Sequence, residues 1–177
     1  MQQVRDGDLR KLAVLFERHH RALFHFFLRC TGNRELAEDL VQEVYFRILR
    51  YRHTYDPKYS FTAWMYQVAR NAQMDHFQKR RPEPLPDGDE GGDRLPSAAP
   101  LADEELSREQ EVAILKKAMD LLPEDKRQLL VLSRYQELKY EEIAQILGIE
   151  VGAVKVRVFR AIKALGQLYM QLSGAKA

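Results

Sequence analysis

Residues 140–165 read YEEIAQILGIEVGAVKVRVFRAIKAL, and this stretch decides how the rest of the chain is interpreted. Ile143, Ala144 and Leu147 recur at three- and four-residue spacing, which predicts one face of a short helix. Gly148 follows them, a residue suited to ending a helix in the left-handed conformation. A second helix then presents an apolar stripe formed by Val154, Val158, Ile162 and Leu165. Two short helices joined by a glycine-containing turn predict a helix-turn-helix.

Basic side chains cover the opposite side of the second helix, and no acidic residue occurs between Val151 and Ala177. Such a surface suits the phosphates and base edges of a DNA major groove. An ordinary helical hairpin with a solvated basic face would carry the same charges. The ordered set of Ile, Ala, Leu, Gly and Val favours DNA binding. The basic residues are Lys155, Arg157, Arg160 and Lys163.

The small net charge of +2 conceals an uneven distribution along the 177 residues. Residues 82–105 hold eight acidic residues and one basic residue, Arg94. The rest of the chain keeps 27 basic and 18 acidic residues, a net charge of +9. The parts outside this segment are therefore basic, as expected for a protein with a polyanionic partner.

Cysteine content and hydropathy indicate where the protein works. The single cysteine, Cys30, excludes an internal disulfide and fits a reducing cytosol. No signal peptide is expected, because residues 4–12 are charged and interrupted. No apolar run approaches the roughly 20 residues that span a bilayer. We therefore expect a cytoplasmic protein with no membrane insertion.

Two helices are expected at the start of the chain, over residues 8–31 and 34–51, with Asp8 and Asn33 as their N-caps and with Gly32 and Asn33 ending the first. The buried face of the first comprises Leu9, Leu12, Phe16, Leu23 and Phe27, and that of the second Leu36, Ala37, Leu40, Val41, Val44 and Ile48. The second helix begins acidic and ends basic, which suits the helix dipole and equally suits a protein-docking surface. The histidines of the first helix lack the spacing of a metal site, so no metal ligand is predicted.

A third helix is expected over residues 61–80, capped by Ser60, where aromatic and basic residues alternate. This pattern is typical of single-strand binding, in which exposed rings stack on bases. A place in the core is the alternative, and it is favoured for Phe61 and Trp64. The polar end, Asn71 to Arg81, is predicted to contact nucleic acid.

The organisation that follows is all-α, with two small helical domains joined by a flexible linker. Domain 1 covers residues 1–81, the acidic Pro- and Gly-rich linker covers 82–105, and the second domain covers 106–177. The second domain opens with a helix whose apolar residues are Val112, Leu115, Ala118, Met119 and Leu122. Pro123 then begins another helix, and the run QLLVLSRY at 128–135 is expected at the centre of the small core.

The order of these parts resembles the compact extracytoplasmic-function (ECF) group of the sigma-70 family. NRELAEDLVQEVYFRILR resembles the segment that docks on core RNA polymerase, and FTAWMYQVARNAQMDHFQKRR resembles the segment that reads the −10 element. Residues 122–165 resemble the domain that reads the −35 element of promoter DNA. This resemblance implies a sigma factor that directs initiation without catalysis or a cofactor, and that is controlled by an anti-sigma factor.

The resemblance also assigns site residues. It implies polymerase docking by Glu38, Asp39, Gln42 and Glu43. It implies −10 contacts, including capture of an unstacked base, by Asn71, Asp75, Lys79, Arg80 and Arg81. It implies −35 contacts by Lys155, Val156, Phe159 and Arg160. The core polymerase would hold the two domains at a fixed separation, whereas the linker would leave them uncoupled in the free protein.

Two other classes of protein compete with this interpretation. A dimeric helix-turn-helix regulator explains residues 140–165 but not the aromatic and basic third helix. A nucleic-acid enzyme using Asp39, Glu43 or the histidines lacks paired carboxylates or metal-ligand spacing. The sequence does not identify the promoter, the inducing signal or the regulator.

Overall fold

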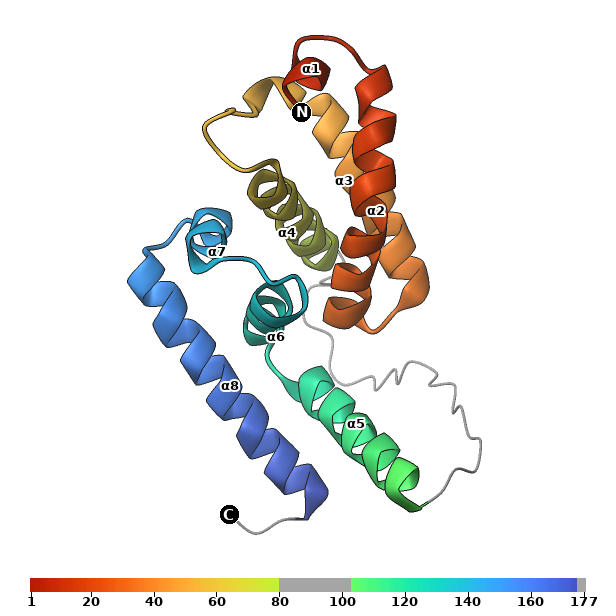
Figure 1. Ribbon diagram of the computed structural model, residues 1–177, viewed down its shortest axis with the longest axis vertical. Helices are drawn as coiled ribbons and strands as arrows, with labels where there is room; N and C mark the ends of the chain where they lie inside the picture. Colours follow the sequence, from red (N-terminus) through yellow and green to blue (C-terminus); the bar gives the residue numbers. More distant parts are fainter. Residues whose placement is uncertain (80–102, 175–177) are drawn as a thin grey trace.

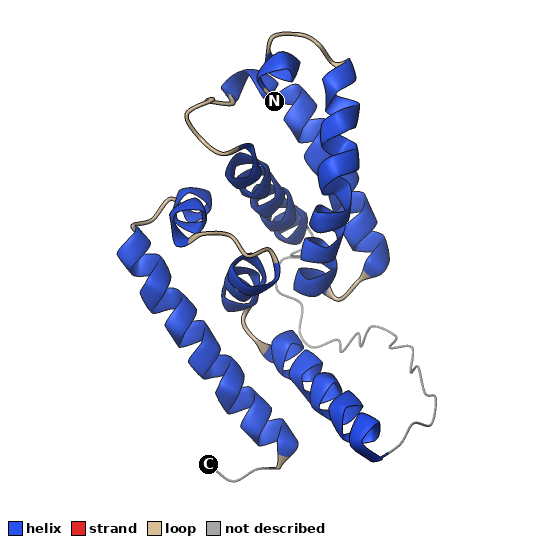
Figure 2. Cartoon of the chain, in the orientation of Figure 1, coloured by secondary structure: helices blue, strands red, loops and turns tan. Residues whose placement is uncertain are grey.

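Every regular element in the described part of the chain is helical (Figures 1 and 2). The computed structural model describes residues 1–79 and 103–174. The all-α fold class is confirmed. The elements are α1 (Gln2–Arg5), α2 (Arg10–Thr31), α3 (Arg34–Arg50), η1 (Arg52–Thr54), α4 (Phe61–Lys79), α5 (Asp103–Leu121), α6 (Glu124–Leu130), η2 (Val131–Tyr135, a π-helical turn), α7 (Tyr140–Leu147) and α8 (Val151–Ser173).

The predicted end signals are found at the helix ends of the N-terminal half. Gly32 ends α2 in the left-handed conformation, with φ of +69°. The Asn33 side chain accepts a hydrogen bond from the backbone N–H of Leu36 at 3.0 Å, so it caps α3. The Ser60 hydroxyl accepts one from the backbone N–H of Ala63 at 3.4 Å. These caps fix where three helices begin or end.

Helices α2, α3 and α4 pack together as the N-terminal half (Figure 1). The apolar face predicted for α3 is confirmed, because all of its members except the half-buried Leu36 are buried. The face predicted for α2 is wrong at its N-terminal end, where Leu9 is 48% and Phe16 38% exposed and Leu15 is buried instead. Leu9 precedes the helix, and Phe16 lies at the edge of the stripe against Tyr45. Asp8 accepts a hydrogen bond from the backbone N–H of Arg10 at 3.3 Å, although the N-cap position falls on Leu9.

In the C-terminal half, α5 and α8 pack side by side, with α6 and α7 also against α8 (Figure 1). Of the run 128–135 that was predicted at the centre of the core, residues 128–132 are buried, whereas Arg134 and Tyr135 are exposed, so the prediction is wrong at its C-terminal end. Three members of the apolar sets expected on these helices are exposed: Val112 at 64%, Leu115 at 37% and Ile162 at 40%. Helices α5 and α8 extend beyond α6 and α7 (Figure 1). Helix α5 begins at Asp103, which lies inside the range 82–105 assigned to the linker. The rest of that range, residues 82–102, lies outside the described part of the chain.

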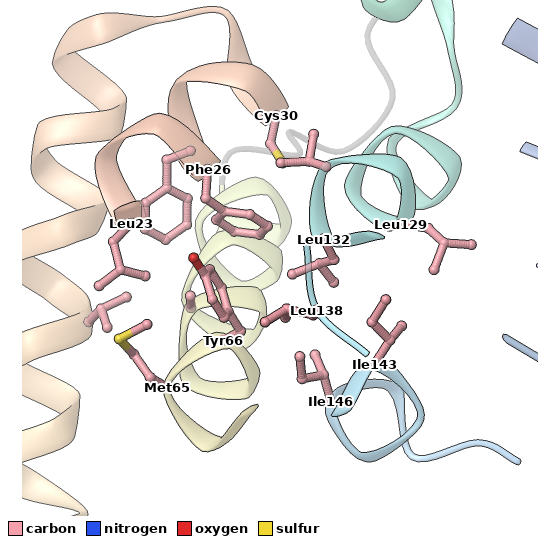
Figure 3. Close-up of a cluster of buried hydrophobic side chains, with 14 of the residues drawn as sticks. Leu23, Phe26, Cys30, Met65, Tyr66, Leu129, Leu132, Leu138, Ile143 and Ile146 are labelled. Carbon is pink, nitrogen blue, oxygen red and sulfur yellow. The ribbon is translucent and has the colours of Figure 1, made fainter. Parts of the chain in front are cut away.

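The two halves are packed against each other, which differs from the uncoupled arrangement expected from the linker. One continuous buried cluster includes residues of both halves (Figure 3). Helices α2 and α4 contribute Leu23, Phe26, Met65 and Tyr66, and the C-terminal half contributes Leu129, Leu132, Leu138, Ile143 and Ile146. The interaction joins side chains far apart in sequence, which local patterns do not encode.

Candidate nucleic-acid and polymerase interface

The acidic surface of α3 lies opposite its buried face. Burial of Leu40, Val44 and Ile48 orients the helix, and helical spacing then places the acidic residues toward solvent. Glu38, Asp39 and Gln42 are exposed. Glu38 also accepts a hydrogen bond from the Arg34 guanidinium at 3.0 Å on the surface. Three of the four predicted docking residues therefore share one accessible face.

Glu43, the fourth predicted docking residue, is engaged by an arginine that the sequence analysis did not single out. The guanidinium of Arg47 donates to Glu43 at 2.5 Å and to Asp75 at 2.6 Å. Only 19% of the Arg47 side chain is exposed. Burial alone would lower the pKa of Arg47, but hydrogen bonds to the two carboxylates raise it overall. Arg47 thus connects a predicted docking residue on α3 with a predicted −10 residue on α4. The i,i+4 spacing predicts the pairing of Glu43 with Arg47, but it does not predict the contact of Arg47 with Asp75.

The C-terminal part of α4 divides its polar residues between surface and interior. Asn71 is exposed, and Asp75 is partly exposed while paired with Arg47. Gln73, which the pattern placed in the nucleic-acid-contacting end, is fully buried and donates a hydrogen bond to Glu124 of α6 at 2.9 Å. That prediction is wrong for Gln73, whose buried side chain is hydrogen-bonded within the protein. Lys79 is the last residue of α4, and Arg80 and Arg81 lie outside the described residues.

The aromatic residues at the start of α4 pack inside the N-terminal half. Trp64 and Phe61 are half-buried against the core. The ring of Tyr55 lies 5.4 Å from that of Trp64 and 6.3 Å from that of Phe61, both in edge-on geometry. These contacts support the core alternative for Trp64 and Phe61.

The helix-turn-helix forms as predicted. Gly148 adopts φ of +64° between α7 and α8, and the backbone carbonyl of Ala144 accepts a hydrogen bond from the backbone N–H of Ile149 at 3.1 Å. At the start of α7, Glu142 accepts one from the backbone N–H of Lys139 at 3.2 Å. Burial of Val154 and Val158 seats α8 against α6 and α7.

The outer face of α8 presents all four residues predicted to contact the −35 duplex. Lys155 and Arg160 are exposed, and none of the salt bridges found among the described residues involves them. Val156 is 48% and Phe159 69% exposed. Such exposure of a large aromatic ring leaves apolar surface available for a partner. The arrangement combines cations for phosphates with apolar groups for thymine methyls.

A groove of about 770 Å³ separates the exposed surfaces of α4 and α8. Arg70, Met74 and Phe77 of α4 line one side, and Arg157 and Arg160 of α8 line another. Helix α6 contributes both acids and a base to the same groove, namely Glu124, Asp125 and Lys126. Surfaces predicted to read two separate DNA elements therefore meet in one depression.

The described residues also bear on metal binding and on membrane insertion. Within residues 1–79 and 103–174, no three His, Cys, Asp or Glu side chains gather in an arrangement that could hold a metal ion. None of the helices in these same ranges is long and apolar enough to cross a membrane.

Comparison with known proteins supports the assignment of both halves. Residues 15–83 match the family Sigma-70 region 2, and residues 112–165 match Sigma-70, region 4. The RNA polymerase sigma factor CarQ of Myxococcus xanthus is 32% identical over 173 residues, with 97% of each chain covered. The chain belongs to the ECF sigma factors of the sigma-70 family.

A second relative of this sigma factor is the ECF RNA polymerase sigma factor SigE of Mycolicibacterium smegmatis. It is 33% identical over 149 residues, which span 82% of this chain and 56% of the relative. A solved structure of the sigma factor RpoE from Bartonella quintana, in complex with the anti-sigma factor NepR, has a TM-score of 0.68 and 23% sequence identity. The alignment covers 90% of this sigma factor and 96% of RpoE, and it shows a shared fold.

Proposed function

We propose that this sigma factor docks on core RNA polymerase through α3 and directs it to promoters by reading a −35 duplex with α8 and a melted −10 strand with α4. The observation that carries the proposal is the exposed outer face of α8, where Lys155 and Arg160 flank the uncovered ring of Phe159. This face belongs to a helix-turn-helix, whose second helix reads bases in the major groove. The chain contributes recognition and the polymerase contributes the chemistry.

Docking is assigned to the acidic face of α3. Glu38, Asp39 and Gln42 project to solvent from a helix fixed by its own core contacts, so a basic partner can approach them directly. Glu43 would bind the partner in competition with Arg47, which already holds it.

Reading of the −10 strand is assigned to the exposed Asn71, to Asp75 beside Arg47, and to the basic residues that follow. An unstacked base must recover a few kcal/mol from its pocket, and Asn71 offers both amide donors and an acceptor. Lys79, Arg80 and Arg81 would bind nearby phosphates.

An anti-sigma factor is proposed as the regulatory partner. The support is the structural similarity to RpoE of Bartonella quintana, which was solved bound to its anti-sigma factor NepR. The sites of docking, DNA reading and regulation would then all lie in the cytoplasm, where the polymerase and the promoter are.

Transcription with purified core polymerase on a genomic DNA library tests the function. We expect defined start sites that depend on the added sigma factor. Asp39→Lys should abolish association with core polymerase and leave the fold intact, because Asp39 is exposed. Glu111→Lys, the same charge reversal on the exposed surface of α5, is the control. Association retained by Asp39→Lys would move docking away from this face.

Arg160→Ala tests the −35 assignment separately. If Arg160 reads a base, initiation should weaken by about 1–3 kcal/mol in the free energy of promoter binding. Lys163→Ala, an exposed base on the same helix but outside the predicted set, is the matched control. Transcription that is unchanged in Arg160→Ala would remove this residue from the site.

A further inference from the structure

A row of basic residues runs along one face of α2, outside the docking and DNA-reading surfaces described above. The row comprises Lys11, Arg18, Arg21 and Arg29, and we call these four residues the α2 stripe. They follow one another at intervals of seven, three and eight residues, which places them on a single helical face. At about 1.5 Å of rise per residue, the stripe is about 27 Å long.

The α2 stripe faces solvent. All four of its side chains are exposed, whereas Leu23 and Phe27 on the other side of the same helix are buried. Within the described part of the chain, no salt bridge involves any stripe residue. The guanidinium of Arg29 lies 4.5 Å from the ring centre of Tyr135, a contact that leaves its positive charge uncompensated. The stripe is therefore available to a partner.

Acidic residues are nearly absent from α2. Glu17 is the only aspartate or glutamate of this helix. It precedes Arg21 by four residues, a spacing that allows an ion pair, but no such pair is present among the salt bridges of the described residues. Interspersed charges of both signs keep the field at a protein surface small. A row of one sign instead creates a positive potential that attracts a polyanion.

The neighbouring helix α3 carries the opposite charge in its first half. Its acidic residues are Glu35, Glu38, Asp39 and Glu43. Helices α2 and α3 pack against each other (Figure 1), yet Glu38 and Glu43 pair with arginines of α3 itself and not with the stripe. The N-terminal half thus presents a basic helix beside an acidic one. Charges separated in this way fit two partners of opposite charge.

The composition of the stripe favours phosphate groups over a protein surface. Three of its four members are arginines, whose planar guanidinium can donate two parallel hydrogen bonds to one phosphate. Protein interfaces depend on large apolar anchors, but the apolar side chain that the row offers is Val14, at 43% exposure. Phe159 of α8, at 69%, shows the contrast. Cations without an apolar anchor suit contacts to the DNA backbone.

We propose that the α2 stripe is a further DNA-binding surface, which holds the phosphate backbone of duplex DNA without reading its sequence. Its length corresponds to about eight base pairs at about 3.4 Å each. The surface lies on a different helix from α4 and α8, so the inference does not depend on the promoter contacts assigned to them. The stripe supplies affinity that is independent of sequence and falls steeply with salt, because each cation displaces condensed counterions.

Salt dependence measures the stripe directly. The full chain is titrated with a short duplex of random sequence between about 50 mM and about 200 mM salt. Every protein also carries Lys155→Gln and Arg160→Gln, so that α8 contributes little. Arg18→Gln with Arg21→Gln removes two phosphate contacts, which should lower the slope of log K against log salt by about 1.8. Over this range, the parent should lose about twelvefold more affinity than the variant.

The matched control is Lys116→Gln with Lys117→Gln, which removes the same charge from the exposed surface of α5. Its slope should equal that of the parent. Arg18→Lys with Arg21→Lys should also keep the parent slope, because counterion release depends on charge. Glu17→Gln removes the single acid of α2 and should tighten binding, a gain that misfolding cannot produce.

Equal slopes in the Arg18 and Arg21 variant and in the control would overturn the proposal, as would unchanged affinity in Glu17→Gln. Equal slopes combined with weaker association with core polymerase would assign the stripe to an acidic protein partner instead, and DNA binding would again be excluded. Failure of the α8 assignment has a different signature. In that case Lys155→Gln with Arg160→Gln alone would leave promoter binding unchanged, whatever the stripe does.

Discussion

The two halves differ in how each forms its core. In the N-terminal half, α3 buries its apolar face mainly against α2 and α4, so the main contacts of this helix stay within one half. In the C-terminal half, η2 and α7 pack against α2 and α4 of the other half as well as against their own neighbours. The C-terminal half also leaves Val112 and Leu121 about 60% exposed. From this difference we expect the N-terminal half to be the more independent of the two, and the C-terminal half to depend on the other for part of its stability.

Truncating one isoleucine in each half should produce the largest effect. Ile48→Ala removes a fully buried side chain from α3, and Ile146→Ala removes one that is 2% exposed from α7. Each truncation should cost about 2–5 kcal/mol. Trp64 is the single tryptophan, and its fluorescence reports unfolding of the N-terminal half. Ile48→Ala should lower the urea midpoint of this signal by an amount that corresponds to its whole loss of stability. Ile146→Ala should lower the midpoint of helical circular dichroism while shifting the Trp64 midpoint much less.

Two results would contradict the expected difference between the halves. If both variants shift the Trp64 midpoint equally, the two halves unfold as one cooperative unit, and the core of the N-terminal half is not independent. If neither shift exceeds a few tenths of a kcal/mol, the side chains are not packed as described.

Two glycines allow a matched substitution in each half. Gly32 ends α2 and Gly148 ends α7, with φ of +69° and +64°, and a Cβ added to either would meet no atom within 4 Å. The cost of alanine is therefore confined to backbone strain, about 1–2 kcal/mol at each position. Gly32→Ala should lower the Trp64 midpoint, whereas Gly148→Ala should act on the helix-turn-helix and weaken −35-dependent transcription. Full transcription in Gly148→Ala would show that the turn tolerates a different geometry.

Local signals in the sequence predicted much of the fold. Gly32, Asn33 and Gly148 mark helix ends because the groups that they satisfy or the conformations that they allow lie within a few residues. The outer face of α8 followed from the same local periodicity, since burial of Val154 and Val158 places the other residues toward solvent.

The features that the sequence did not reveal involve residues far apart in the chain. Arg47 reaches Asp75 across 28 positions, and Gln73 reaches Glu124 across 51. A polar residue that will be buried by a distant helix has the same local pattern as one that stays in water, so Gln73 was assigned to the surface. The packing of the halves has the same origin, because the long acidic segment between them carries no information about which surfaces meet.

Acidification should produce the smallest effect and should act on one half only. All five histidines lie in the first 76 residues, and none lies in the C-terminal half. Burial lowers the pKa of His19 from its usual 6.5, and the His19 ring packs edge-on against Phe61 at 5.2 Å. The unfolded chain therefore takes up the proton more readily than the folded one, so stability that is present above pH 6.5 is lost as the pH falls. Between about pH 7.5 and about pH 5.5, the Trp64 urea midpoint should decrease in wild type and decrease less in His19→Gln, whose side chain does not titrate. An equal decrease in both proteins would place the titrating group elsewhere in the N-terminal half.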